Sequence, residues 1–516
     1  MNSQLARHVL DQLQLAGVRE IVVCPGGRNA PFVELLAGLS FRATWHFEER
    51  SAAFFALGRA RALGEPVAVC TTSGTAAGEL LPAAMEGFYS GTPLILLTAD
   101  RPRRFRASGA PQAAEQKNLF EPYTVGSFDL EGSERLDLSG FEVAAPLHVN
   151  VCFEEPGAEP TPPPAPGSQK WIDAPAKALT GFLGASRAPL VILGALLPEE
   201  RNPVERFLLE LGAPVYAEAP SGLRESVTLG SLSLAIGDRL FARTAAAGYP
   251  VDSVVRIGGV PTHRIWRDLE DRQAMLPVMS VSRFGFSGLG RASKLGLGSV
   301  AEILGMTSIA RVKVDTTGLA ANDHVLASRL QGLLGQEPRS EPGLFRALSR
   351  RIEPGAGVYL GNSLPIREWD LAATREQRGY EVTASRGLNG IDGQVSTFLG
   401  ACRAGRANWA LLGDLTALYD QSGPWVLGQM PGIQATIAVI NNSGGRIFER
   451  MFGRPEFLNA HGLAFESWAE MWGMQYQLCH SVEEISSLGQ GVRVVELRPD
   501  AESTARFWNG YEELLA

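Results

Sequence analysis

Two groups of oxygen-bearing residues stand directly after strand-like apolar runs in the last third of this 516-residue chain. Asp414 follows the run 409–412, and Asn442 lies just beyond the run 436–440. Neighbouring strands of a parallel sheet end at one edge, where ligands bind, so Asp414 and Asn442 should meet there. A carboxylate, an amide oxygen and a backbone carbonyl such as that of Gly444 suit Mg²⁺, which adds water and phosphate oxygens. The spacing therefore predicts a metal and diphosphate site.

Each group also has an ordinary structural interpretation, because Asp, Asn and Gly favour helix caps and turns. Asp414 could cap a helix, and the segment 441–445 could be only a turn. Together they resemble the thiamine-diphosphate signature, which is GDG, a gap of some two dozen residues, and then NN. The gap here runs from Thr416 to Ile440. Leu415 stands where the general signature has glycine.

The same cofactor chemistry requires a carboxyl group elsewhere in the chain. In the thiamine-diphosphate enzymes that the signature resembles, a glutamate bonded to the aminopyrimidine drives the cofactor to its imino form, which removes the thiazolium proton. Those enzymes place this glutamate in the amino-terminal domain of the partner subunit, after a strand. Glu49, just before the helix-like stretch 51–63, has this placement and is the expected catalytic residue. The alternative is that Glu48 and Glu49 merely favour the positive end of a helix dipole.

Further segments extend the match from the cofactor to one family. They are HFEERSAAFFALGRA, TTSGTAAGELLPA, LILLTADRP, GNSLPIR, SRGLNGIDG, GDLTALYD and NNSGGRIFERM. Together they resemble the 2-succinyl-5-enolpyruvyl-6-hydroxy-3-cyclohexene-1-carboxylate synthase family of menaquinone biosynthesis, which also has GDL in place of GDG. The resemblance implies a transferase that uses thiamine diphosphate and Mg²⁺, with Mn²⁺ as an alternative metal. It would decarboxylate 2-oxoglutarate and add the succinyl carbanion to isochorismate.

Both implied substrates are dicarboxylates, so the pocket must hold several negative charges in a chain of net charge −8. Arginine's planar and permanently charged fork suits that task, although any single arginine could instead form a surface ion pair. Gln112 matches a further substrate-binding position, and His263 with Arg264 takes the place of a lysine–arginine pair. A histidine of ordinary pKa ~6.5 is mostly neutral at pH 7. Four arginines near predicted strand ends match substrate-binding positions of the family: Arg28, Arg101, Arg367 and Arg386.

The remaining expected cofactor contacts come from the resemblance alone. Ile391 would wedge beneath the cofactor and hold its bent form. Ile447 and Phe448 would line the pocket of the reactive carbon and contact both cofactor and substrate. Asn362 and Ser363 would donate to the diphosphate. For the apolar residues, ordinary core packing is the alternative, and one sequence leaves both interpretations open.

Strand-like runs alternate with helix-like segments along most of the chain, which predicts parallel sheets covered on both faces. We expect an α/β protein with three doubly wound parallel-sheet domains of the thiamine-diphosphate-enzyme type. A proline-rich stretch at 154–167 and a polar region near 335–343 mark the boundaries. The expected domains are a pyrimidine-binding domain at 1–155, a central Rossmann-like domain at 170–335 and a diphosphate-binding domain at 340–516.

Composition narrows the function classes. No apolar run approaches the ~18 residues that suggest a membrane span, and a negative chain is unsuited to wholesale nucleic-acid binding. The first residues lack the apolar region of a signal peptide, so we expect a cytoplasmic protein with neither membrane nor nucleic-acid partners. Five scattered cysteines indicate no disulfide framework and no cysteine zinc site.

Two other functions stay open on the sequence. An acetolactate-synthase-like enzyme or a simple 2-oxo-acid decarboxylase would use the same cofactor but would not need these arginines. A catalytically silent cofactor-binding protein would not need Glu49 together with Asp414 and Asn442. By resemblance, the cofactor bridges the domains of two chains, so we expect a homodimer at minimum and a homotetramer as the larger assembly.

Overall fold

The structure is a computed structural model whose described residues form two compact units, each treated by itself. Unit 1 comprises Met1–Lys170, Gly387–Gly405 and Leu415–Ile433, and unit 2 comprises Trp171–Arg386, Arg406–Asp414 and Gln434–Ala516. The side chains of Arg267 and Phe448 are not described. The described residues are 2–103, 106, 113–139, 143–154, 174–261, 263–269, 272–285, 289, 293–387, 389–449, 458–486 and 491–515.

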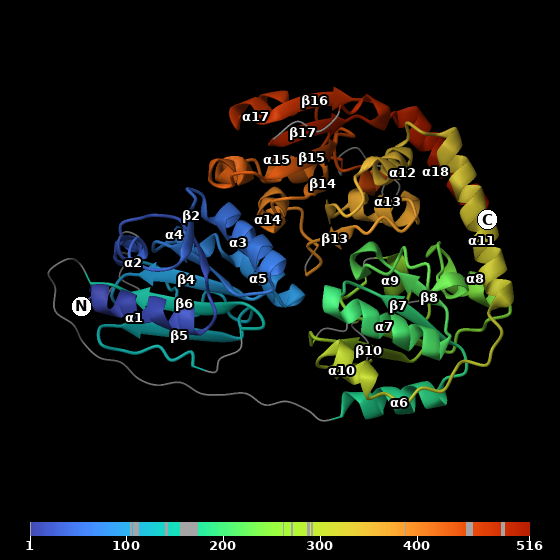
Figure 1. Cartoon of the computed structure of the whole chain (residues 1–516), viewed down its shortest axis with the longest axis horizontal. Helices are drawn as coiled ribbons and strands as arrows, with labels where there is room; N and C mark the ends of the chain where they lie inside the picture. The colour runs from blue at the N-terminus through green and yellow to red at the C-terminus, as the bar shows by residue number, and fades with distance from the viewer. Residues whose placement is uncertain are drawn as a thin grey trace. The chain divides into compact units, whose positions relative to one another are not determined.

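A six-stranded parallel sheet, sheet A, forms the centre of unit 1 (Figure 1). Its strand order is β2-β1-β3-β4-β6-β5. From β1 the chain adds β2 on one side and β3 on the other, so a switch point lies between β1 and β3, and α/β sheets bind ligands at such points. Strands β3 and β4 are buried throughout, which accounts for the apolar residues that make up most of both. The strands are β1 (Glu20–Val23), β2 (Arg42–Trp45), β3 (Val67–Thr71), β4 (Leu94–Asp100), β5 (Gly126–Glu131) and β6 (Leu147–Cys152).

One pair of helices in unit 1 packs backbone against backbone. Helix α3 (Glu49–Leu63) lies against α14 (Gln394–Ala401). A Cβ on Gly58 would lie 2.1 Å from the carbonyl oxygen of Thr397, and a Cβ on Gly400 would lie 2.2 Å from that of Phe55. Only glycine permits this approach, so α3, which begins at Glu49, is held firmly. The other helices are α1 (Asn2–Leu15), α2 (Ala30–Leu36), α4 (Thr75–Gly78), α5 (Leu81–Ser90) and the 3₁₀ helix η4 (Gly423–Gln429).

Unit 2 contains two parallel sheets, sheet B with the order β11-β10-β9-β7-β8 and sheet C with the order β13-β12-β14-β15-β17-β16. The strands of sheet B are β7 (Pro189–Leu193), β8 (Val215–Ala217), β9 (Ser253–Ile257), β10 (Val278–Ser282) and β11 (Lys294–Leu297). Those of sheet C are β12 (Gly357–Leu360), β13 (Glu381–Thr383), β14 (Ala407–Gly413), β15 (Gln434–Ile440), β16 (Gln475–Cys479) and β17 (Val492–Leu497). The order of sheet C repeats that of sheet A, strand for strand.

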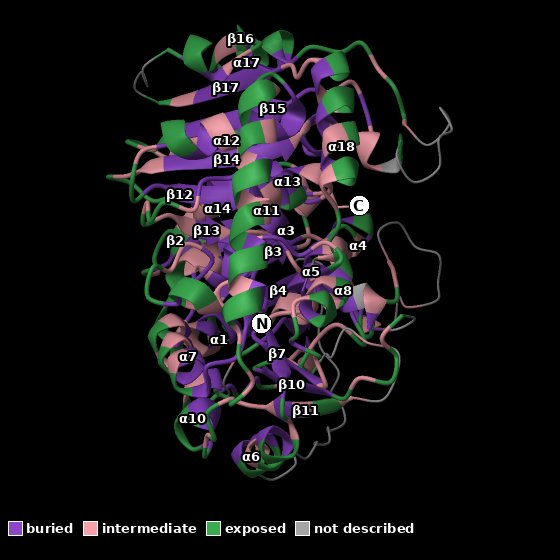
Figure 2. Cartoon of the chain, turned by 90° about the vertical axis from the view of Figure 1, so that its right-hand side faces the viewer, coloured by how far each residue is buried: buried purple, intermediate pink, exposed green. Residues whose placement is uncertain are grey.

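Helices cover these sheets, and Figure 2 shows buried residues concentrated on the strands while the outer face of α11 (Thr317–Gln336) is exposed. Helix α15 (Asp414–Tyr419) begins directly after β14. Beside α11, the α-helices that lie wholly in unit 2 are α6 (Pro175–Ala185), α7 (Pro198–Leu211), α8 (Leu240–Ala246), α9 (Arg264–Asp268), α10 (Val300–Gly305), α12 (Glu341–Arg351), α13 (Leu364–Ala372), α17 (Glu466–Met471) and α18 (Ala501–Leu515).

The three parallel sheets confirm the predicted fold class. Each sheet lies within one predicted domain range, yet 387–405 and 415–433 group with unit 1, so the exact domain boundaries stay predictions. Among the described helices, none combines the length and the apolarity that crossing a membrane requires.

Candidate active site

The edge of sheet C brings together the ends of the two strands that carry the predicted metal ligands. Gly413 of β14 pairs with Ile440 of β15, so the residues that follow them emerge side by side. Asp414 is 2% exposed, and its Oδ2 accepts a hydrogen bond from the Gly444 backbone N–H at 2.9 Å. The Gly444 carbonyl accepts a bond from the Arg446 N–H at 2.9 Å, which leaves its second lone pair for another partner.

The amide of Asn442 has one satisfied end and one unsatisfied end. Its Nδ2 donates to Oε1 and Oε2 of Glu341 at 3.1 and 3.0 Å. Its Oδ1 is buried and has no hydrogen-bond partner among the residues that the structure describes. Buried polar atoms are almost always paired, so an orphaned oxygen requires an explanation. An amide oxygen beside a buried carboxylate fits the oxygen-ligand chemistry of Mg²⁺.

Other charges around Asp414 support the same interpretation. Nε2 of His461 lies 3.3 Å from Asp414 Oδ2, and the Leu463 N–H donates to His461 Nδ1 at 3.2 Å. Burial raises the pKa of Glu341 to about 7; the bond from Asn442 opposes this rise and the charge of Asp414 adds to it. A divalent cation at this edge would offset two crowded carboxylates.

Gly444 has a backbone conformation that no other residue adopts easily. Its φ is +135°, and a Cβ there would lie 2.4 Å from the Leu458 carbonyl oxygen. We expect Gly444→Ala to lower the free energy of unfolding by about 1–3 kcal/mol, the usual cost of a strained backbone conformation. Mg²⁺ should stabilise the variant less than the wild type, because the carbonyl of residue 444 moves. Thermal unfolding with and without Mg²⁺ measures both effects, and an unchanged melting temperature would contradict them.

The switch point of sheet C gathers the next predicted residues. Asn362 is fully buried after β12; its Nδ2 donates to the Ser385 carbonyl at 2.8 Å and its Oδ1 accepts from Arg386 at 2.5 Å. Ser363 precedes α13 with φ +72°, and its carbonyl accepts a hydrogen bond from the exposed side chain of Arg367. The structure thus brings these four residues together. The side-chain amide of Asn362 is engaged by protein groups, so its role as a diphosphate donor stays a prediction.

His263 and Arg264, the two predicted residues in the part of the chain that carries sheet B, lie in different environments. His263 is partly buried against the Tyr216 ring, at 5.1 Å between centroids. Burial lowers the pKa of His263, Asp238 opposes this, and the positive charge of Arg367 lowers it further, which places the imidazole within electrostatic reach of Arg367. Arg264 is 57% exposed and pairs with Asp268 one turn along α9. His263 therefore lies near Arg367 as a neutral ring, whereas Arg264 faces solvent.

The structure distinguishes the two glutamates at the start of α3. Glu48 is the N-cap: it accepts bonds from the N–H groups of Arg50 and Ser51, both at 3.0 Å, and from the Ser422 hydroxyl at 2.9 Å. Burial acts to raise the pKa of Glu48, but the bonds from Ser51 and Ser422 outweigh it and lower that pKa.

Glu49 has a different environment. Apart from its own N–H, its carboxylate has no hydrogen bond to any residue in the described ranges. Burial raises the pKa of Glu49, and the charges of Glu48 and Glu79 raise it further. A carboxyl group with a raised pKa and no protein partner is suited to share a proton with a ligand. The helix-cap alternative therefore describes Glu48 and not Glu49.

The capping role of Glu48 can be tested separately. Glu48→Ala removes the acceptor of two helix N–H groups, and we expect it to lower the free energy of unfolding by about 0.5–2 kcal/mol. Urea denaturation measures this loss. A stability equal to that of the wild type would show that the cap contributes nothing.

Arg28 lies shortly after the end of a strand of unit 1. The backbone N–H of Arg28, after β1, donates to Thr72, and its guanidinium donates to the Phe153 carbonyl at 3.1 Å. Ile391 in unit 1 and Ile447 in unit 2 are partly buried. Gln112 and the side chain of Phe448 lie outside what the structure describes.

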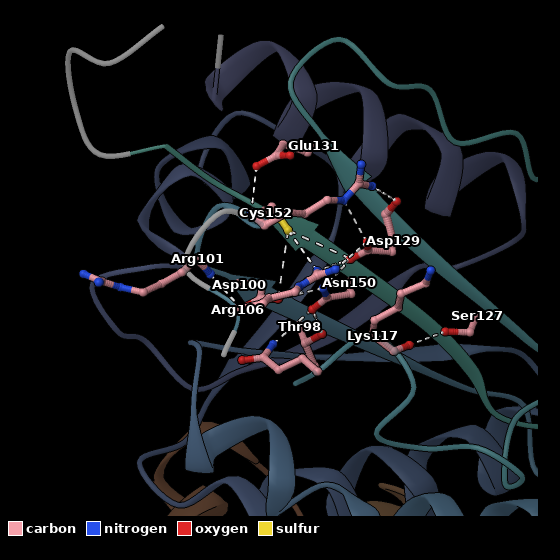
Figure 3. Close-up of polar contacts among 12 residues, drawn as sticks. Thr98, Asp100, Arg101, Arg106, Lys117, Ser127, Asp129, Glu131, Asn150 and Cys152 are labelled. Atoms are coloured by element: carbon pink, nitrogen blue, oxygen red, sulfur yellow. Dashed lines mark hydrogen bonds and ion pairs between the residues drawn. The ribbon is translucent and has the colours of Figure 1, made fainter. Parts of the chain in front are cut away.

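A polar network that the sequence did not reveal joins the ends of β4, β5 and β6 (Figure 3). Arg106 donates to Asp129 at 2.6 Å and to Asp100 at 3.2 Å, and Asn150 donates to the same carboxylates at 2.8 and 3.0 Å. Ligand atoms of Asp100, Asp129 and Cys152 lie within 4.8 Å of one another, but Arg103 and Arg106 already form ion pairs with these carboxylates. The Arg101 backbone N–H donates to Asp100 Oδ1 at 2.7 Å, so the network holds the backbone of Arg101 while its side chain points away in Figure 3.

Comparison with known proteins agrees with this geometry. Residues 3–119 match the family model described as thiamine pyrophosphate enzyme, N-terminal TPP binding domain. A solved structure from Mycobacterium smegmatis, described as a candidate thiamin diphosphate-dependent enzyme, aligns with a TM-score of 0.69 over 96% of this chain and 99% of that one. At 16% identity it shows the fold alone.

Curated relatives are similar along their whole length. The 2-succinyl-5-enolpyruvyl-6-hydroxy-3-cyclohexene-1-carboxylate synthase of Bdellovibrio bacteriovorus is 41% identical, with 99% of each chain covered. The synthase of the same name from Akkermansia muciniphila is 41% identical over 98% of each chain, and that from Geobacillus thermodenitrificans is 32% identical over 95% of this chain and 92% of its own. The chain belongs to the 2-succinyl-5-enolpyruvyl-6-hydroxy-3-cyclohexene-1-carboxylate synthase family, as its motifs predicted.

Proposed function

We propose that the chain decarboxylates 2-oxoglutarate and transfers the remaining succinyl unit to isochorismate, using thiamine diphosphate and Mg²⁺. The observation that carries the cofactor assignment is the buried, unpaired Oδ1 of Asn442 at the sheet edge where Asp414 begins α15. The family supplies the reaction, because synthases of this name match the chain from end to end. This makes the chain a transferase of menaquinone biosynthesis.

The proposed cofactor site divides its work among few residues. Asp414, Asn442 Oδ1 and the Gly444 carbonyl would hold Mg²⁺ against the diphosphate. When bound, thiamine diphosphate supplies the carbon that adds to a 2-oxo acid and accepts the electron pair of the bond that breaks when carbon dioxide leaves. Glu49, with its raised pKa, would hold a proton at the pyrimidine nitrogen. Ile391, Ile447 and the neighbouring Phe448 would contact the cofactor's apolar surface.

The substrates would be bound mainly by charge. Arg367 and Arg386 lie together at the switch point of sheet C, where guanidinium groups can form paired hydrogen bonds with carboxylates. His263 adds a neutral ring beside Arg367, suited to a hydroxyl or a carboxylate through hydrogen bonding. Of the other proposed contacts, Arg28 and Arg101 belong to unit 1 and Gln112 to the segment after β4. Arg264, paired with Asp268, is the weakest candidate.

A substrate assay tests the reaction directly. Purified protein with thiamine diphosphate and Mg²⁺ should release carbon dioxide from 2-oxoglutarate, and mass spectrometry should detect the succinyl adduct only when isochorismate is added. Pyruvate is the control substrate. Faster turnover with pyruvate would favour the acetolactate-synthase-like alternative, and no carbon dioxide from either acid would favour a silent cofactor-binding protein.

An exposed aromatic cluster in unit 1 supports self-association. Trp45, Phe47 and Trp425 are 38%, 55% and 44% exposed, and the rings of Phe47 and Trp425 lie 4.8 Å apart. Trp425 also donates to the Trp45 carbonyl at 3.2 Å. Clustered exposed aromatics mark interaction surfaces, and two members of this cluster, Trp45 and Phe47, lie just before Glu49 in the chain. We infer that a second copy of the chain covers it, in a homodimer at minimum and a homotetramer as the larger assembly.

The proposed dimer should combine Glu49 of one chain with the metal ligands of the other. Glu49→Gln and Asp414→Ala, each inactive alone, should regain activity when they are unfolded together and refolded as mixed dimers. One of the two sites then has an intact Glu49 and an intact metal group, and the other has both lesions. Mixed dimers that form, as native mass spectrometry would show, yet stay inactive would contradict the shared site.

We further place the protein in the cytoplasm, without membrane or nucleic-acid partners. All five cysteines are free and buried, which fits a reducing compartment.

A further inference from the structure

We propose that Glu341 is a positioning residue that fixes the orientation of the Asn442 amide, so that Oδ1 and not Nδ2 faces the metal. The inference rests on the proposed Mg²⁺ site and adds a residue that lies outside every motif of the family resemblance.

The hydrogen bonds of the amide select one of its two orientations. Nδ2 of Asn442 lies 3.1 and 3.0 Å from the two oxygens of the Glu341 carboxylate. An ionised carboxylate only accepts hydrogen bonds. If the amide were rotated by half a turn, its oxygen would face two other acceptors at these distances. Glu341 therefore excludes the orientation that would present N–H groups to a cation.

Glu341 is itself held in place from several sides. It is 3% exposed and is the first residue of α12. Its backbone N–H donates to the Thr504 hydroxyl at 3.0 Å. The preceding Ser340 caps the helix by accepting from the Gly343 N–H at 3.0 Å. A buried carboxylate is costly unless it has hydrogen-bond donors, and the Asn442 amide supplies two such bonds.

The oxygen of the Asn442 amide indicates the role of this orientation. Oδ1 of Asn442 is buried without a hydrogen-bond partner among the described residues, so the protein itself does not use it. Groups that bond to the ligands of a metal commonly fix the direction of those ligands, and their loss costs roughly 10–100-fold in metal affinity. Glu341 has this relation to Asn442, whose amide it orients.

Two conservative variants test the orientation of the amide. Glu341→Gln removes the charge and also the selection of orientation, because its amide N–H can donate to Asn442 Oδ1 when the Asn442 amide is rotated. Glu341→Asp keeps the charge but withdraws the acceptor by one methylene. We expect both variants to bind Mn²⁺ roughly 10-fold or more weakly than the wild type. The measurement is an electron paramagnetic resonance titration of Mn²⁺ at saturating thiamine diphosphate.

Thr504→Val is the matched control, because it removes the bond to the Glu341 backbone N–H but leaves the carboxylate unchanged. It should lower the melting temperature and leave Mn²⁺ affinity near that of the wild type. The inference is overturned if Glu341→Asp binds Mn²⁺ as tightly as the wild type, or if Thr504→Val weakens binding as much as Glu341→Asp. If Asp414→Ala binds Mn²⁺ as tightly as the wild type, the proposed metal site is overturned instead.

Discussion

Replacing Glu49 by glutamine should lower turnover by about 10²- to 10⁴-fold, the usual contribution of a positioned proton donor or acceptor. The carboxyl group has no hydrogen bond to the described residues beyond its own N–H, so little of the fold depends on it. Because glutamine and glutamate have nearly equal volumes, the free energy of unfolding and the cofactor affinity should stay close to those of the wild type. Carbon dioxide release from 2-oxoglutarate, measured with saturating thiamine diphosphate and Mg²⁺, tests the prediction.

Glu48→Ala is the matched control for this experiment. Glu48 is the adjacent carboxylate, but its oxygens cap α3 and bond to Ser422. Its replacement should lower stability and leave most of the turnover when the assay temperature is well below the melting temperature. Near-normal turnover in Glu49→Gln, or an equal loss in both variants, would contradict the assignment of Glu49.

Asp414→Ala should weaken cofactor binding more than any other single change to the metal group. The variant loses one hard oxygen ligand and the acceptor of the Gly444 N–H, which also positions the Gly444 carbonyl. We expect a loss of thiamine-diphosphate affinity beyond the roughly 10–100-fold typical of residues that only support a ligand. Excess Mg²⁺ should restore part of the affinity. Equal affinities for variant and wild type, with and without excess Mg²⁺, would contradict the metal role of Asp414.

The parts of the molecule that the sequence predicted depend on local patterns. Apolar runs predicted parallel strands because a doubly covered sheet needs apolar residues on both faces. The neighbouring ends of β14 and β15 followed from their motif, because adjacent strands of a parallel sheet end at the same edge. The fold class and the family are confirmed, whereas the individual site residues stay predictions.

The sequence could not predict what depends on contacts between distant segments. Glu341 bonds to Asn442 from the start of a helix far upstream, and no spacing rule joins the two. The grouping of 387–405 with unit 1 depends on α14 packing against α3 through Gly58 and Gly400, and a single glycine in a helix has no unique interpretation. Glu48 and Glu49 looked alike, because only the backbone geometry decides which of them is the cap.

Sheets A and C share one strand order, which relates the helices α3 and α14 that pack against each other. Each helix follows the second strand of its own sheet in chain order, so the two are counterparts. Their contact is reciprocal, since Gly58 meets Thr397 as Gly400 meets Phe55, three residues apart on both sides. Such self-complementarity is the property of an interface between identical subunits. The contact between α3 and α14 therefore has, within a single chain, the local two-fold relation of such an interface.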